Sequence, residues 1–196
     1  MSRATGKLVV HHRSEGAAVG TLDAFFLMRC FGAVSPEDIQ ATRQCADILS
    51  AFRPEGGVSI VAIDPTSTFP SEATRRTAIH VSRETNHQAV GVALIILGDG
   101  FWASAIRGVI MTLASLSPTD SAHPRKVVRH EEEGVDWAIE LLRESPQRYR
   151  AALLAALNQL KRTATAPPVS SKEPPSTSKP PGATSKMPPS SKRQAG

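Results

Sequence analysis

The chain contains few of the residues that mark specialised classes of protein. Its 196 residues include only two cysteines and 5% aromatic residues. Two cysteines cannot build the disulfide framework of a small secreted domain, so we expect Cys30 and Cys45 to be free, reduced and buried. No apolar run approaches the roughly 18 residues of a membrane-spanning helix, and residues 1–12 lack the apolar core of a secretory signal. These absences predict a soluble, cytoplasmic protein with no membrane partner.

Basic charge and proline are concentrated near the C-terminus. The chain has a formal charge of +5, but residues 163–196 hold five basic residues against one acid, together with eight of the 15 prolines. This segment repeats Ser/Thr-Ser-Lys about every seven residues and has almost no bulky apolar side chains. It cannot bury enough apolar surface to offset its ordering entropy, so we expect a disordered tail. Its charge predicts only weak, salt-dependent attraction to nucleic acid.

The residues before this tail alternate between strand and helix patterns. Residues 14–23, which include Gly16 and Gly20, are interpreted as a loop or irregular hairpin. The alternation predicts an α/β fold with a mixed, mainly parallel five-stranded sheet and crossover helices. The predicted strands are 7–12, 24–31, 58–63, 89–97 and 126–130, and the predicted helices begin near Pro36, Ser71, Phe101, Glu131 and Pro146.

The predicted helices carry their own start signals and one apolar stripe. Ser35 is a candidate N-cap for the first helix, with Pro36 at its first position and Asp38 three residues after the cap. In the fifth helix an apolar stripe is expected to pack on the preceding domain, with a partner or a second copy as alternatives; it consists of Tyr149, Leu153, Leu157 and Leu160. We therefore expect a domain at 1–144, an additional helix at 145–162 and the tail at 163–196.

Two segments resemble a known family. Gly98-Asp99-Gly100 followed by Phe101-Trp102-Ala103-Ser104-Ala105-Ile106-Arg107 resembles the glycine turn and Phe-x-Ala-Ala-x-Arg helix start of SpoIIAA-like proteins, a group of STAS domains. Gly134–Leu142 resembles their closing Ala-x-x-Trp-Leu helix. The resemblance covers residues 7–144. It implies the fold of an anti-sigma-factor antagonist and a bacterial, regulatory, non-catalytic module that binds another protein.

The resemblance also points to a serine. In the antagonist branch, phosphorylation of a serine in an Asp-Ser-Ser-Gly turn blocks docking onto a partner kinase. The matching stretch, 69–73, keeps Ser71 but lacks the Asp, the second Ser and the Gly. Ser71 is thus the first candidate phosphosite, and Ser67 and Thr68 are the others. The favoured interpretation of Ser71 is nevertheless a helix N-cap, because serine is a preferred residue at the start of any helix.

The glycine turn is the second candidate site. It matches the G-x-G-x-x-A pattern of dinucleotide-binding loops, but the Asp99 carboxylate would face a pyrophosphate, and two aromatic side chains crowd its approach. A tight strand-to-helix turn explains the glycines. We instead predict contact with a protein partner or a ligand, with exposed aromatic side chains as anchors; the residues are Gly98, Asp99, Gly100, Phe101 and Trp102.

No pattern in the sequence predicts catalysis, a metal site or a cofactor. His11 and His12 are adjacent on a strand and point to opposite faces, and the acids 131–133 suit the start of a helix. We expect a protein-binding module that is not an enzyme, with a homodimer possible. Two alternatives stay open: a nucleotide- or lipid-binding protein or enzyme that uses the crevice at the carboxyl ends of the strands, and a weak nucleic-acid binder that uses the tail.

Overall fold

The computed structural model describes residues 6–116 and 123–162; the predicted tail lies outside the described residues. One sheet contains six strands, each beside its neighbour in sequence. The strands are β1 (Val9–Arg13), β2 (Ala17–Leu22), β3 (Phe25–Cys30), β4 (Gly57–Ile63), β5 (Ala89–Ile96) and β6 (Arg125–Val128). The helices are α1 (Pro36–Phe52), α2 (Glu72–Thr85), the short 3-10 helix η1 (Asn86–Gln88), α3 (Gly100–Leu116), α4 (Glu131–Leu141) and α5 (Pro146–Arg162).

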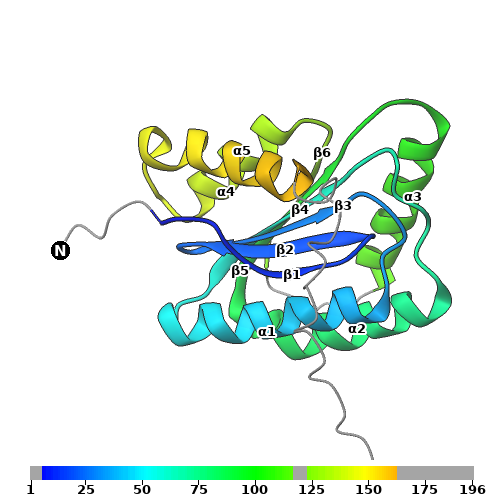
Figure 1. Ribbon diagram of the computed structural model, residues 1–196, viewed down its shortest axis with the longest axis horizontal. Coiled ribbons are helices and arrows are strands. Elements are labelled where there is room, and N and C mark those ends of the chain that lie inside the picture. Colours follow the sequence, from blue (N-terminus) through cyan, green and yellow to red (C-terminus); the bar gives the residue numbers. More distant parts are fainter. Residues whose placement is uncertain (1–5, 117–122, 163–196) are drawn as a thin grey trace, which may run out of the picture.

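The sheet is mixed and its helices lie in layers. Strands β1 to β3 are antiparallel, whereas β3 to β6 run parallel to one another. Helices α1 and α2 lie on one side of the sheet and α4 and α5 on the other, while α3 stands at one end (Figure 1). The predicted α/β class with a mixed, mainly parallel sheet is confirmed. None of the described helices combines the length and the hydropathy that a membrane crossing requires.

The prediction of five strands was wrong by one, because residues 17–22 form β2 and not a loop. All six residues of β2 are buried, and the strand pairs along its whole length with β3. Gly20 suggested a turn, but it lies inside the strand, where a Cβ atom would come within 2.7 Å of the Val9 carbonyl oxygen. Glycine therefore permits a close approach of two strands here. The actual turn is at Asp23, with a φ of 49°.

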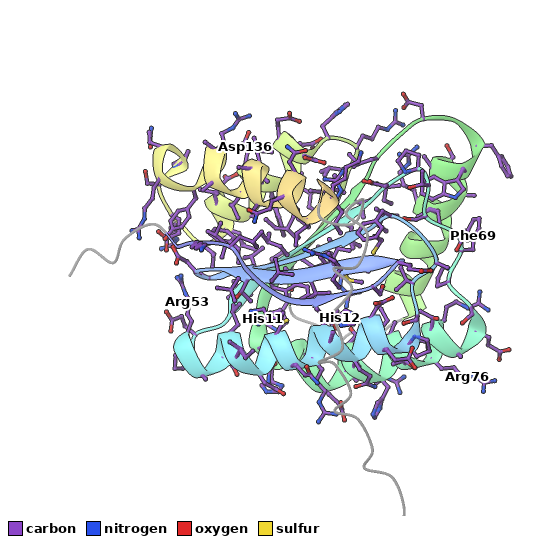
Figure 2. The ribbon with its side chains drawn as sticks, in the orientation of Figure 1. His11, His12, Arg53, Phe69, Arg76 and Asp136 are labelled. Atoms are coloured by element: carbon purple, nitrogen blue, oxygen red, sulfur yellow. The ribbon has the colours of Figure 1, made fainter. Side chains whose placement is uncertain are left out.

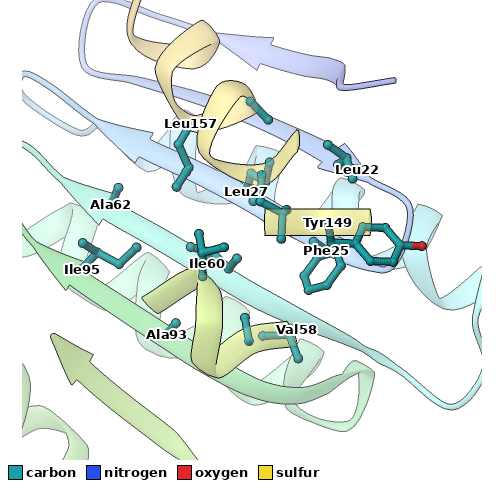
Figure 3. Close-up of a cluster of buried hydrophobic side chains, with 14 of the residues drawn as sticks. Leu22, Phe25, Leu27, Val58, Ile60, Ala62, Ala93, Ile95, Tyr149 and Leu157 are labelled. Carbon is teal, nitrogen blue, oxygen red and sulfur yellow. The ribbon is translucent and has the colours of Figure 1, made fainter. Parts of the chain in front are cut away.

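The larger part of the core lies between the sheet and helices α4 and α5. Side chains from β2 to β5 alternate into it, as Figure 3 shows for Leu27, Ile60 and Ile95. The predicted stripe of α5 packs here with all four side chains buried, and the Tyr149 ring lies 5.3 Å from that of Phe25, centroid to centroid. The prediction that the fifth helix packs on the domain is confirmed.

The opposite core, between the sheet and α1, contains both cysteines. Cys30 and Cys45 are buried beside Phe26, Met28 and Leu49, and neither forms a disulfide. Burial raises the pKa of each thiol to about 12; the nearby carboxylates Asp38 and Asp64 also raise that of Cys30. The thiols therefore stay protonated and behave as small apolar side chains.

The start of α1 follows its sequence signals. The Ser35 hydroxyl accepts the Asp38 backbone N–H, and the Asp38 carboxylate accepts the Ser35 N–H at 2.8 Å, so the capping box is complete. Asp38 also lies 2.7 Å from the His12 ring on β1. Burial alone would raise the pKa of the Asp38 carboxyl, but hydrogen bonds from Ser35, Ser14 and His12 outweigh it and lower the pKa. The carboxylate thus joins β1 to α1.

Candidate functional site

The carboxyl ends of the parallel strands bring the predicted site residues to one edge of the sheet. We call the segments 64–71 and 97–102, which follow β4 and β5, the carboxyl edge. The two segments touch: the Leu97 N–H donates to the Ile63 carbonyl oxygen at 2.9 Å, and a Cβ atom on Gly98 would come within 2.7 Å of Pro65. Pro65, at the start of the segment that carries the serine candidates, therefore lies against the glycine turn, although the two are about 30 residues apart in sequence.

The glycine turn has the backbone that only glycine adopts readily. Gly98 has a φ of 85° and Gly100 a φ of 89°, both in the left-handed region. The first is also held against the Pro65 ring, whereas a Cβ atom on the second would meet nothing within 4 Å. The turn thus leads directly from β5 into α3 and presents the first residues of that helix at the edge.

Aromatic side chains are exposed on both segments. Phe101 is 88% exposed and Phe69 is 48% exposed. Phe69 lies at the end of the molecule where α3 also stands (Figure 2). Trp102 is only half-buried and packs against a small cluster that includes Ala103 and Ile106. Asp99 is exposed between the two glycines, so the edge carries apolar rings beside one carboxylate.

Ser71 caps α2. Its hydroxyl accepts the Thr74 backbone N–H at 3.1 Å and also lies 2.9 Å from the Thr74 hydroxyl. That hydroxyl donates to the Val34 carbonyl oxygen, which ties the start of α2 to the loop before α1. Ser71 itself remains exposed. The cap and an accessible hydroxyl therefore coexist at this position.

The other two serine and threonine candidates differ in exposure. Thr68 is exposed, and its backbone N–H donates to the Gly32 carbonyl oxygen at 3.3 Å. Ser67 is only 4% exposed, and its hydroxyl has no hydrogen-bond partner among the described residues. A kinase reaches an exposed hydroxyl, so the burial of Ser67 leaves Ser71 and Thr68 as the candidates for modification.

Removal of the Ser71 cap is expected to destabilise the protein by about 0.5–2 kcal/mol. Ser71→Ala leaves the Thr74 N–H without its acceptor, whereas Ser71→Asp supplies a carboxylate oxygen and should keep most of the stability. Urea unfolding of both variants measures this difference. Equal stability of Ser71→Ala and the wild-type protein would contradict the role of Ser71 as a cap.

A buried ion cluster lies next to the carboxyl edge, and the sequence interpretation missed it. Arg29, near the end of β3, is 2% exposed. Its guanidinium donates to Asp64 through Nε at 3.0 Å and Nη2 at 2.7 Å, and to Glu131 through Nη1 at 2.7 Å. Nη1 also donates to the Leu157 carbonyl oxygen at 3.3 Å. One side chain thus connects β3 with the end of β4 and with both helices of the larger core.

The charged groups of this cluster are paired with one another, which leaves little for a substrate to bind. The Asp64 carboxylate accepts both nitrogens of Arg29 through one oxygen, and its other oxygen lies 3.5 Å from Nζ of Lys161. Both Arg29 and Asp64 are nearly inaccessible to solvent. A carboxylate that is buried and paired in this way does not act as a free base, so the cluster holds elements together.

The sequence did contain a signal for this cluster. Arg29 is the only charged residue in the apolar run from Ala24 to Phe31, and a charge in a buried strand needs a partner. Asp64 follows β4 immediately, and the parallel register places Arg29 opposite Ala62. The apolar character of the run alone does not reveal which acid pairs with its arginine.

The described residues include no ready metal site. Within 6–116 and 123–162, no group of three or more His, Cys, Asp or Glu side chains is arranged so that it could hold a metal ion. The two adjacent histidines have separate partners: His11 lies 2.8 Å from the Thr21 hydroxyl, and His12 pairs with Asp38 (Figure 2).

No family model, curated protein or solved structure matches the chain.

Proposed function

We propose that the protein is a non-catalytic, regulatory interaction module of the SpoIIAA-like type, and that a protein partner docks on the carboxyl edge. The observation that carries this proposal is Phe101, which is 88% exposed at the first turn of α3. A large aromatic side chain held in solvent gains most by insertion into a pocket of a partner.

The neighbouring residues support the same surface. Phe69, from the loop before α2, adds a second aromatic ring, which is half-exposed. The contact between Gly98 and Pro65 fixes the two segments relative to each other, so little conformational entropy is lost when a partner binds. Exposed aromatic side chains on a fixed edge are typical of protein interfaces.

Ser71 gives this surface a means of control. Its exposed hydroxyl lies at the N-terminus of α2, where the helix dipole favours a phosphate. A phosphoserine there adds about −1.5 to −2 charges at pH 7, two residues after the exposed Phe69. A partner that docks through an apolar contact would then have to desolvate the phosphate, so phosphorylation is expected to weaken binding.

Phe101→Ala is expected to reduce partner capture at least tenfold, because truncating an interface hot spot costs 2 kcal/mol or more. Tagged wild-type and variant proteins are compared by quantitative affinity capture from the cells that produce the chain. Ile79→Ala is the matched control: Ile79 is 44% exposed, but it lies in the middle of α2. The proposal requires a protein that Phe101→Ala loses and Ile79→Ala keeps.

Capture of the same proteins at the same level by wild type and Phe101→Ala would refute docking through this edge. The switch is tested separately with Ser71→Asp, which adds charge and preserves the cap, against Ser71→Ala, which removes the cap without charge. Loss of the partner by the Asp variant alone supports control by charge. Unchanged capture by Ser71→Asp would reject control by phosphorylation at Ser71 but would not contradict the docking surface.

A further inference from the structure

The first half of α3 has one face that packs on the sheet and an opposite face that is exposed. Ala103 and Ile106 are buried, in the small cluster that joins the helix to the end of β5. On the opposite side of the helix, Phe101, Ser104 and Gly108 are all exposed. Because α3 stands at one end of the sheet (Figure 1), this outer face of α3 is open to a partner.

The outer face of α3 carries a projecting ring and a gap, two helical turns apart. Phe101 and Gly108 are seven residues apart, which places them on the same side of the helix at about 10 Å along its axis. Phe101 projects its ring into solvent, whereas a Cβ atom on Gly108 would meet nothing within 4 Å. Midway between them, Ser104 and Ala105 have small side chains. The face therefore has a knob at one end, a hole at the other and a flat part between.

A face of this shape is complementary to a second copy of itself. When two such helices run antiparallel about a two-fold axis between Ser104 and Ala105, Phe101 of each copy lies opposite Gly108 of the other. Two identical contacts then form at once, as in the isologous interface of a two-fold dimer. In each contact the ring of one helix fills the gap on the other, which is the way that knobs pack into holes between paired helices.

The charges at the two ends of the face are complementary in the same arrangement. Asp99 is exposed just before the helix, and Arg107, near the far end of the face, has Nη2 at 3.5 Å from the Ser104 hydroxyl. Neither charge has an oppositely charged partner among the described residues. In the antiparallel pair, Asp99 of one copy lies about three residues, or about 4.5 Å along the axis, from Arg107 of the other. The long arginine side chain spans this distance, so two reciprocal ion pairs flank the aromatic contacts.

We propose that the protein forms a two-fold dimer through the outer face of α3, in which the Phe101 ring of each copy fills the gap over Gly108 of the other. The inference rests on the docking role of Phe101 in the proposed function, and it names a second copy of this chain as the partner. One helix face buries less area than a standard protein interface. We therefore expect the dimer to dissociate in the micromolar range.

Sedimentation equilibrium of the purified full chain, over concentrations that span this range, measures the dimer directly. The wild-type mass is expected to rise from 20.9 kDa to twice that value. Phe101→Ala removes the ring and Gly108→Leu fills the gap, so each should weaken association at least about tenfold. Leucine has a higher helix propensity than glycine, so Gly108→Leu does not act by weakening the helix. Ala73→Leu, at an exposed position of α2, is the control and should associate as the wild type does.

A charge exchange tests the antiparallel direction. Asp99→Lys and Arg107→Glu each place like charges opposite one another, so each variant alone is expected to associate at least about tenfold more weakly than the wild type. An equimolar mixture of the two variants restores opposite charges at both ends, so it should form a heterodimer. Loss in each variant alone together with rescue in the mixture requires Asp99 and Arg107 to face each other across the two copies. Thermal unfolding of each variant is recorded first to verify that it folds.

Three results would overturn the dimer: a wild-type chain that stays monomeric throughout the series, association of Gly108→Leu at the wild-type level, or no rescue in the mixture of charge variants. The outcomes also separate this inference from the proposed function. A monomeric chain whose Phe101→Ala variant still loses a captured protein would reject the dimer and assign the docking surface to a different protein. If Phe101→Ala changed neither the mass nor the capture, both proposals would be rejected.

Discussion

Leu157→Ala is expected to lower the free energy of unfolding by about 2–5 kcal/mol, the usual range when a buried leucine is truncated and leaves a cavity. Leu157 is fully buried in α5, and it packs in the same cluster as Leu27 and Ile60 from the sheet. The helix lies against β2, β3 and α4. Its stripe is therefore part of the main core and is unavailable to a partner.

Urea unfolding with linear extrapolation measures this loss. Leu154→Ala is the matched control, because it makes the same substitution on the same helix at a half-buried side chain, so it should cost less. If Leu157→Ala were no more destabilising than Leu154→Ala, α5 would not contribute to the core as the structure shows. The test also decides whether residues 145–162 should be counted with the domain.

Arg29→Met is expected to destabilise the protein by about 3–5 kcal/mol, as does the removal of one partner from a buried ion pair. The Asp64 carboxylate would stay buried, with only Lys161 nearby at 3.5 Å. Glu131 would lose its partner as well, although it is partly exposed. The cost comes from the uncompensated charge and not from a loss of side-chain volume, since methionine fills much of the same space.

Two controls separate these causes. Arg76→Met breaks the exposed pair with Glu72 on α2, and exposed helix pairs of this spacing are worth only about 0.3–0.5 kcal/mol. The double variant Arg29→Met/Asp64→Leu leaves no buried unpaired carboxylate at this position, so it should be more stable than Arg29→Met alone. A loss below about 1 kcal/mol for Arg29→Met would show that the cluster is solvated in solution.

The class of the fold was predictable because hydrophobic periodicity and helix signals are local. The capping box at Ser35 and Asp38 and the stripe of α5 follow from residues a few positions apart, and the structure contains both. β2 was not predictable in the same way: its small residues Ala17 and Ala18 have weak strand preference. They are buried because α1 covers one face of β2 and α5 covers the other, and this is a tertiary effect.

The candidate site, too, was predictable from the sequence only in part. The neighbourhood of Pro65 and Gly98 follows from two parallel strands that end at one edge, which the strand order already suggests. The exposure of Phe101 and the burial of Ser67 depend on how α3 and the loop before α2 pack against the rest of the fold. Neither could be predicted from spacing. The pairing of Arg29 with Glu131 spans 102 residues and required the complete fold.

The order of the strands in the sheet has a kinetic consequence. Because each strand lies beside its predecessor in the chain, the sheet can grow strand by strand during synthesis, first through the short connections between β1, β2 and β3 and then through the longer helical connections to β4 and β5. The face that α4 and α5 cover is completed only when the last helix emerges, since Arg29 binds the Leu157 carbonyl 128 residues later. Until then the part of this face that α5 covers on β2 and β3, which includes Leu27, is open to solvent, and the nascent chain is expected to be most prone to aggregation and to chaperone capture at that stage.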